Sequence, residues 1–388
     1  MLRFLTAGES HGPELVTIIE GAPAGFDVDL AAINQDLARR QKGYGRGGRM
    51  AIEKDEVRVV SGIRFGRTMG SPVTLIVANR DYKNWEKRMS VDPADRGEAK
   101  VVTRPRPGHA DLAGVLKYNL EDIRDVLERA SARETTARVA AGAFGKQLLA
   151  PFGVTILGYV TSIGATAAHT PPELGVAELA RLTEDSQVRV ADPAAERAII
   201  AEIDECKKTG DTLGGVVEVI AVGLPVGLGS HVQWDRKLDG RIGHALLSLQ
   251  AVKGVEFGMG FGAAHVRGSA LHDELGYDAA ARRFTRHSNN SGGTEGGMST
   301  GEPLRVRVAF KPLSTLMRPL RSADIRTKAE ALGTIERSDV CAIPAAAVIA
   351  EAAVAFVVAG SFLDKFGGDS LAEISRNYHG YLDQVRNY

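Results

Sequence analysis

The alternation of apolar and polar residues along the chain predicts several strands. The clearest is the segment 304–310, written LRVRVAF, in which apolar residues occupy every second position. This period of two is typical of a strand with one buried face. Apolar runs rich in β-branched residues predict further strands at 57–60, 73–78, 154–163 and 215–222.

Apolar residues at helical spacing predict helices at 30–41, 110–127, 133–150 and from 193 to about 210. Asp29 is suited to cap the first of these, and Asp192 followed by Pro193 to begin the last. Strands and helices occur in clusters rather than in strict βαβα alternation. The pattern therefore favours an α+β fold with antiparallel sheets over a doubly wound parallel sheet.

The segment 340–363 is almost entirely apolar and is long enough for a transmembrane helix. Pro344 interrupts it near its start, Glu351 places a charge in its middle, and its many alanines lower its hydrophobicity. We therefore predict a helix that is buried on all sides in a large core.

The composition is that of a globular protein, with 44% hydrophobic and 25% charged residues among 388. Lys and Arg total 48 and so do Asp and Glu, which argues against a dedicated nucleic-acid binder. Cys206 and Cys341 form no C-x-x-C motif, and the first residues contain no secretory apolar run. We expect a reducing, cytoplasmic compartment. No repeat or linker marks an internal boundary, so we treat 1–388 as one domain.

Positive charge gathers in three loops rich in Gly or Pro, at 37–49, 103–109 and 311–321. Guanidinium groups bind carboxylate and phosphate oxygens in a forked geometry, so these loops together predict a site for a small polyanion. Solvated surface charge is the alternative. The segment 43–48 matches G-x-G-x-x-G, but it follows a predicted helix rather than a strand, so a dinucleotide site of the usual kind is not supported.

His11 and His109 lie in glycine-containing turns, the second beside two arginines. Imidazole titrates near neutral pH, so both are candidate proton donors or acceptors, with ordinary turn histidines as the alternative. No histidine pattern suggests a zinc site, and we predict no metal. Ser131 lies where the helix 133–150 begins, where it could cap the helix or help to bind an anion. Asp339 lies two residues from Arg337, which also fits a salt-bridged turn.

Seven motifs in this order resemble the chorismate synthase family over nearly the whole chain: TAGESHG at 6–12, RRQKGYGRGGR at 39–49, RPGHAD at 106–111, RASARET at 129–135, GGTEGGM at 292–298, KPLST at 311–315 and RSD at 337–339. Ala130 and Leu313 stand where some members have serine and isoleucine, and neither exchange removes a catalytic group. The resemblance implies an α+β layered sandwich of helices between two antiparallel sheets.

The resemblance further implies a lyase that converts 5-enolpyruvylshikimate 3-phosphate to chorismate and phosphate. This anti-1,4-elimination is the last common step of the shikimate pathway. It requires reduced FMN without net redox change, and family members are generally homotetramers. No reductase domain is evident, so we expect an external flavin reductant, with reduction by NADPH within the chain as the alternative.

The resemblance also implies roles for single residues. His11 would protonate the reduced flavin or the leaving phosphate, His109 would hold or protonate the anionic partner, and Asp339 would act with flavin N5 in deprotonation. The substrate would be bound by Ser10, Arg40, Arg46, Arg49, Arg106 and Arg133. The flavin would be bound by Arg129, Ala130, Ser131, Gln250, Ala251, Gly296, Lys311, Pro312, Leu313, Ser314, Thr315 and Arg337.

Two other classes of function remain open from the residues alone. A phosphate-handling enzyme without a flavin would use the same anion-binding loops. An RNA-binding module could also use the arginines, but only 22 of 388 residues are aromatic, counting 12 Phe, 8 Tyr and 2 Trp, and no base-stacking motif accompanies them.

Overall fold

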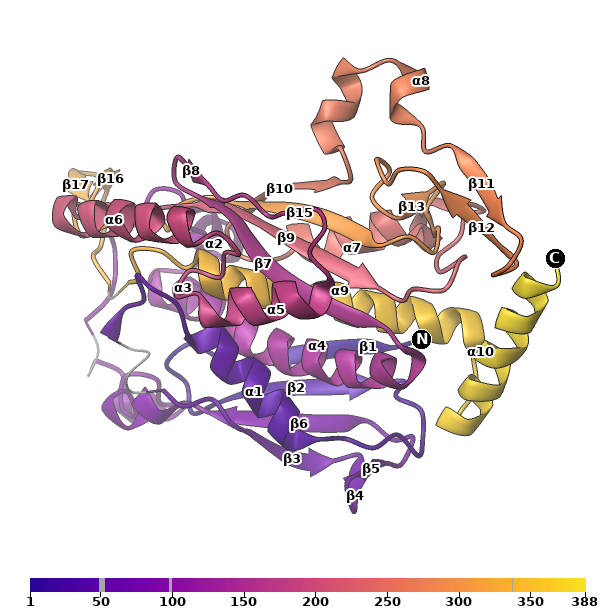
Figure 1. Cartoon of the computed structure of the whole chain (residues 1–388). Coiled ribbons are helices and arrows are strands. Elements are labelled where there is room, and N and C mark those ends of the chain that lie inside the picture. Colours follow the sequence, from indigo (N-terminus) through magenta and orange to yellow (C-terminus); the bar gives the residue numbers. More distant parts are fainter. Residues whose placement is uncertain (49–52, 98–99, 337) are drawn as a thin grey trace.

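Two antiparallel sheets enclose a layer of helices in the computed structural model, which describes residues 1–48, 53–97, 100–336 and 338–388 (Figure 1). The first sheet has the strand order β1 (Arg3–Ala7), β2 (Glu14–Glu20), β6 (Val73–Ala78), β3 (Val57–Ser61). The second has the order β10 (Val252–Phe257), β15 (Leu304–Phe310), β9 (Gly215–Val222), β7 (Thr155–Ile163), β8 (Thr166–Ala167). The predicted α+β sandwich with antiparallel sheets is confirmed, as are all five predicted strands.

The middle layer consists of α1 (Leu30–Gln41), α4 (Thr135–Leu149) and α9 (Ile343–Phe366). Helices α4 and α9 pack with their backbones in contact, because a Cβ on Gly142 would lie 2.3 Å from the carbonyl oxygen of Ala352. The first sheet contacts α4 directly, since the Thr17 hydroxyl on β2 donates to the carbonyl of Ala137 at 3.0 Å. The main hydrophobic cluster contains residues from both sheets and from this layer. That shared core supports the prediction of one domain, which stays a prediction.

Helix α9 confirms the predicted buried helix at 340–363. It is 24 residues long with Pro344 in its first turn, where a missing N–H costs no hydrogen bond. Within the described part of the chain it alone is long and apolar enough to cross a membrane, with a mean hydropathy of 2.1 in its most apolar window. However, 78% of that window is buried inside the protein. Helix α9 is therefore the core of the sandwich.

The predicted helix 110–127 is wrong as a single element. The structure contains α2 (Asp111–Tyr118) and α3 (Arg124–Ala130), separated by Asn119 in the left-handed conformation with φ 54°. Asparagine tolerates this conformation at a helix end, which sequence periodicity does not reveal. The predicted helix 133–150 begins with the 3-10 turn η4 (Ala132–Glu134) and continues as α4. The predictions for α1 and α6 (Pro193–Thr209) are confirmed, including their caps Asp29 and Asp192.

Outer elements cover the sandwich and extend from it. Helix α5 (Val176–Asp185) packs Leu179 against Leu157, Tyr159 and Ile220 of the second sheet, so β7 is buried on both faces. The segment that contains α8 (Gly268–Leu271) projects from the sandwich (Figure 1). The remaining elements are β4 (Ile63–Arg64), β5 (Arg67–Thr68), η2 (Arg80–Asn84), η3 (Pro93–Asp95), η5 (Ala150–Phe152), η6 (Trp234–Arg236), α7 (Leu238–Leu247), η7 (Gly260–His265), α8 (Gly268–Leu271), β11 (Leu275–Asp278), β12 (Arg283–Arg286), β13 (Thr294–Glu295), β14 (Met298–Ser299), β16 (Arg321–Ala323), β17 (Glu330–Leu332) and α10 (Leu371–Arg386).

Candidate active site

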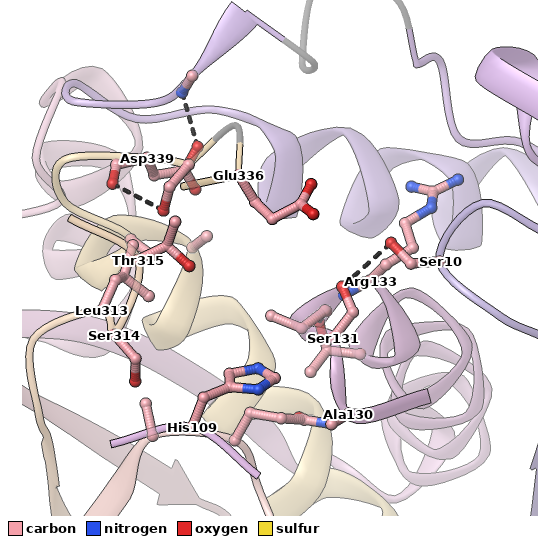
Figure 2. A pocket seen from close by; sticks show the side chains of 18 of the residues that line it. Ser10, His109, Ala130, Ser131, Arg133, Leu313, Ser314, Thr315, Glu336 and Asp339 are labelled. Atoms are coloured by element: carbon pink, nitrogen blue, oxygen red, sulfur yellow. Dashed lines mark hydrogen bonds between the residues drawn. The ribbon is translucent and has the colours of Figure 1, made fainter. Parts of the chain in front are cut away.

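A cavity of about 730 Å³ lies where the first turns of α9 meet α3, η4 and several loops. Ala345, Ala346 and Ile349 of α9 give it an apolar wall, and polar residues from the loops line the rest. Figure 2 shows side chains from segments far apart in the sequence around this common space. The predicted site residues in the lining are Ser10, His11, Arg40, Arg46, Arg106, His109, Ala130, Ser131, Arg133, Gln250, Ala251, Lys311, Leu313, Ser314, Thr315 and Asp339. All three predicted basic loops therefore contribute to one cavity.

Arg40 and Arg133 form a buried pair of guanidinium groups in the cavity wall. Arg40 comes from the last turn of α1 and donates to the Thr135 hydroxyl and the Ala132 carbonyl, each at 3.0 Å. Arg133 donates to Asp55 at 2.7 and 2.8 Å and to Asn79 at 2.9 Å. Within the described ranges, Nη1 of Arg40 and Nη2 of Arg133 have no hydrogen-bond partner. Each of these nitrogens lies near a carboxylate instead, Nη1 of Arg40 at 3.5 Å from Asp55 and Nη2 of Arg133 at 3.7 Å from Glu53.

Arg46 and Asp339 join the loop after α1 to the segment before α9. Nη1 of Arg46 lies 3.1 Å from one oxygen of the Asp339 carboxylate. The backbone N–H of Gly47 donates to the other oxygen at 2.6 Å (Figure 2). Gly47 permits this approach, because a Cβ there would lie 2.9 Å from the carbonyl oxygen of Ser338. The loop 43–48 follows helix α1 rather than a strand, which agrees with the rejection of a dinucleotide motif.

His109 is held by a carboxylate that sequence reasoning did not select. Its Nδ1 lies 2.5 Å from Asp111, and Arg106 donates to the same carboxylate from Nε at 2.9 Å and Nη2 at 3.0 Å. Arg106 also donates to the Thr315 hydroxyl at 2.9 Å. Burial alone would raise the pKa of Asp111, but His109 and Arg106 together hold this pKa below its usual value. Asp111 is therefore an anion that fixes both pocket residues.

His11 is held in a similar way on another wall. Its Nδ1 lies 2.9 Å from one Glu128 oxygen, and its backbone N–H donates to the other at 2.8 Å. The ring stacks on Trp85 with centroids 4.0 Å apart. Burial raises the pKa of Glu128, but His11 and Arg124 more than offset this, so the pKa lies below its ordinary value. A pairing through Nδ1 orients the ring.

Ser131 and Gln250 contribute polar groups to the same cavity. The Ser131 oxygen accepts the backbone N–H of Arg133 and so caps the 3-10 turn η4 that precedes α4. Its hydroxyl also donates to Ser10 at 3.1 Å (Figure 2). Gln250 donates to Glu134 at 3.2 Å, while its own side-chain oxygen is buried and has no hydrogen-bond partner among the described residues. Ala251 adopts φ 70°, a conformation rare for residues other than glycine and common at functional sites.

The loop 311–315 forms the wall near His109 (Figure 2). The Lys311 amine donates to the Ser314 hydroxyl at 2.8 Å, and that hydroxyl donates to the Gly108 carbonyl at 2.8 Å. Burial and the nearby charge of Lys253 lower the pKa of Lys311. Ser314 thereby ties this loop to the turn that carries His109.

Some predicted site residues lie elsewhere. Arg129 does not line the cavity and donates to the carbonyls of Thr6 and Gly8. Gly296 lies in the turn between β13 and β14 and does not line the cavity. Pro312 does not line the cavity. Arg49 and Arg337 lie outside the described residues, and so does the predicted salt-bridged turn between Arg337 and Asp339. In the described part of the chain, the Asp339 carboxylate contacts the Arg46 guanidinium and the backbone N–H of Gly47.

The structure adds residues that sequence reasoning missed. Asp111 lies inside the motif RPGHAD and could have been selected as a partner for His109. Trp85 and Glu128 carried no signal in the sequence, because only folding brings them to His11. Glu336 lines the cavity and accepts from Arg124 at 2.9 Å. A search of the described residues finds no group of three or more His, Cys, Asp or Glu that could hold a metal ion.

Comparisons with known proteins agree over the length of the chain. The family model described as chorismate synthase matches residues 2–363. A chorismate synthase of Symbiobacterium thermophilum is 61% identical over 389 residues, covering 99% of each chain. One of Geobacter metallireducens is 55% identical over 394 residues, covering 100% of each. A crystal structure of a chorismate synthase superposes with a TM-score of 0.80 at 41% identity, covering 100% of this chain and 99% of the other.

Proposed function

Because the chain belongs to the chorismate synthase family, we propose that it is a lyase of the shikimate pathway that converts 5-enolpyruvylshikimate 3-phosphate to chorismate and inorganic phosphate. In this reaction the C–O bond to phosphate and one ring C–H bond break, and a new C=C bond forms. The observation that carries the proposal is the cavity, in which buried arginines and two carboxylate-held histidines face an apolar wall.

The charges of the cavity support an anionic substrate. The proposed substrate has one phosphate and two carboxylates, and Arg40, Arg46, Arg106 and Arg133 all line the cavity. Guanidinium groups bind such oxygens through two parallel hydrogen bonds. Ser10 extends this set, and Arg49 remains a predicted member outside the described residues.

The residues present fit FMN as cofactor. A flavin needs an apolar surface for its ring, partners for the ring's polar edge and cations for its phosphate. The apolar wall from α9, the buried side-chain oxygen of Gln250 and the Lys311–Ser314 pair supply groups of these kinds. When bound in its reduced state, FMN supplies transient electron donation without net redox change. Ala130, Ser131, Ala251, Leu313 and Thr315 complete the described part of the proposed flavin site.

The proposed proton transfers use three residues of this chain. His11 donates a proton toward the leaving phosphate or the cofactor, and His109 holds or protonates an anionic partner. Asp339 takes part in removing the ring proton. Its carboxylate accepts from the backbone N–H of Gly47 and pairs with Arg46, and these contacts hold it at the cavity wall.

We further propose a cytoplasmic homotetramer that receives reduced flavin from an external reductant. Leu5 and Ile18 support self-association, because they form a cross-strand pair on the outer face of the first sheet and both are exposed. Both cysteines are free, which suits a reducing compartment.

The test is phosphate release under anaerobic conditions. With substrate and chemically reduced FMN the protein should release one phosphate per chorismate formed, and with oxidised FMN it should release none. Phosphate release without any flavin would contradict this proposal and favour the flavin-independent phosphate enzyme.

A matched pair of histidine variants tests whether the activity depends on the cavity. His109→Ala should lower turnover by about 10²- to 10⁴-fold, the usual contribution of a positioned proton donor or acceptor. His379→Ala, on exposed α10, should leave turnover unchanged. Equal losses in the two variants would remove His109 from the mechanism.

A further inference from the structure

We propose that Arg124 is a positioning residue for the reaction, which orients His11 through Glu128 and holds Glu336 at the cavity wall. This inference rests on the function proposed above. Arg124 is the first residue of α3, and its side chain does not line the cavity. It therefore has to act through the residues that it contacts.

Arg124 connects two carboxylates that belong to different segments of the cavity. Its Nη1 donates to Glu128 at 3.1 Å, and its Nη2 donates to Glu336 at 2.9 Å. Only 2% of the Glu128 side chain is exposed, so this carboxylate depends on protein groups rather than water for its partners. One guanidinium group thus joins α3 to the segment just before α9.

Glu128 contacts both Arg124 and His11, and it therefore links the position of His11 to that of Arg124. The same carboxylate that Arg124 contacts accepts both the backbone N–H and Nδ1 of His11. The carbonyl of Glu128 also accepts the backbone N–H of Ser10 at 3.0 Å. The turn that carries His11 is therefore fixed to α3 by main-chain and side-chain contacts together.

Trp85 contacts one face of the His11 imidazole ring. It stacks on His11, and the Arg124 guanidinium lies 5.1 Å from the centre of the Trp85 ring, within the range of a cation–π contact. Arg124 thus contacts both groups that hold His11, which are Glu128 at its edge and Trp85 at its face. The geometry assigns Nδ1 of His11 to Glu128, so proton exchange with a ligand would use Nε2.

Arg124→Met removes the guanidinium while keeping much of the apolar stem. If Arg124 positions His11, kcat for phosphate release should fall about 10- to 100-fold, because a small misplacement of a catalytic group has this effect. The substrate KM should change by less than about threefold, because Arg124 does not touch the cavity. Arg181→Met is the matched control, since Arg181 also bridges two carboxylates, Glu178 and Asp185, but on exposed α5. It should change neither constant.

A double-mutant cycle with His11→Ala separates positioning from general loss of structure. In the His11→Ala background, Arg124→Met should lower kcat by less than about threefold further, because the group that it positions is gone. If the two losses multiply instead, or if Arg124→Met alone leaves kcat unchanged, the inference is wrong.

The Arg124→Lys variant and the activity of the parent protein complete the test. Arg124→Lys keeps the charge but cannot fork to both carboxylates, so it should fold like the parent and show an intermediate kcat; a kcat equal to that of the parent contradicts the inference. An inactive parent protein would overturn the proposed function itself. An active parent with an unaffected Arg124→Met variant would overturn only the role of Arg124.

Discussion

Arg39 and Arg40 are neighbours on α1, yet they belong to two different charge clusters. Arg39 points into the helix layer, where it donates to Glu351 at 2.8 and 3.0 Å and to Asp36 at 2.6 Å. Glu184, Lys146 and Arg189, which pairs with Glu184, complete this core cluster. Burial lowers the pKa of Arg39, but the three carboxylates outweigh it and raise this pKa above its ordinary value.

Arg40 points to the opposite side and into the cavity wall. Burial lowers its pKa, and together with the guanidinium groups of Arg133 and Arg46 it outweighs the nearby carboxylate of Asp55, so that the pKa is about 9. The cation at this position is therefore disfavoured by its surroundings, whereas that of Arg39 is favoured. The sequence predicts that Arg39 and Arg40 belong to one basic loop at an anion site, and this prediction is wrong for Arg39.

The difference shows how buried arginines divide into structural and ligand-binding groups. The core cluster satisfies its charges with protein carboxylates and needs nothing further. The arginines of the cavity also have carboxylate partners, which are Asp339 for Arg46, Asp111 for Arg106 and Asp55 for Arg40 and Arg133, but these arginines line a space that an anion can enter. Two adjacent residues of the same type thus have different tasks, because helical geometry directs them to different sides.

The largest effect is expected from removing the charge of Arg39, which tests whether the core cluster is structural. Arg39→Met leaves Lys146 as the remaining cation beside Asp36 and Glu351, so the free energy of unfolding should fall by about 3–5 kcal/mol, as expected when one partner of a buried ion pair is removed. Urea denaturation followed by circular dichroism measures this loss. The exposed Arg181→Met variant should keep the urea midpoint of the parent. A loss from Arg39→Met no greater than that of the control would show that the core cluster is not structural.

A smaller effect, and of a different kind, is expected for Arg40→Met. Substrate affinity should fall about 10- to 150-fold, corresponding to about 1.5–3 kcal/mol for a lost charged hydrogen bond. The urea midpoint should change much less than in Arg39→Met, because the cation at Arg40 is already disfavoured. Equilibrium binding of the substrate measured by calorimetry gives the affinity. Unchanged affinity together with a large loss of stability would place Arg40 with the core cluster.

The smallest effect is expected in the pH dependence of stability, to which Glu351 of the core cluster contributes. Burial raises the pKa of Glu351, but Lys146 and Arg39 outweigh it, so this pKa lies below the ordinary value of about 4.3. The unfolded chain then binds more protons than the folded one, so the stability from Glu351 is present above about pH 4.3 and is lost as pH falls through the folded pKa. Each unit of lowering corresponds to about 1.4 kcal/mol.

Glu351→Gln should therefore flatten the decline of unfolding free energy between about pH 5 and pH 2. Urea titrations at several pH values, run on parent and variant together, measure the slope. Parallel curves for the two proteins would show that Glu351 does not carry this acid sensitivity.

The sequence by itself determined the elements whose signals are local. Alternation found β15, and apolar length with one central charge found α9 as a buried helix. Capping residues placed the starts of α1 and α6. Motif order was specific enough to indicate the family, and most of the site residues selected from the sequence line the cavity. These features need only neighbouring residues, so they can be recognised without the fold.

Only the tertiary structure decided which partner each charged residue has. Glu351 and Arg39 are 312 positions apart, and Glu128 and His11 are 117 apart, so no local pattern joins them. The left-handed turn at Asn119 and the inward direction of Arg39 were also invisible to periodicity. Composition and spacing fix which charges exist, whereas the packing of helices between the sheets decides which charges are compensated and which face the cavity.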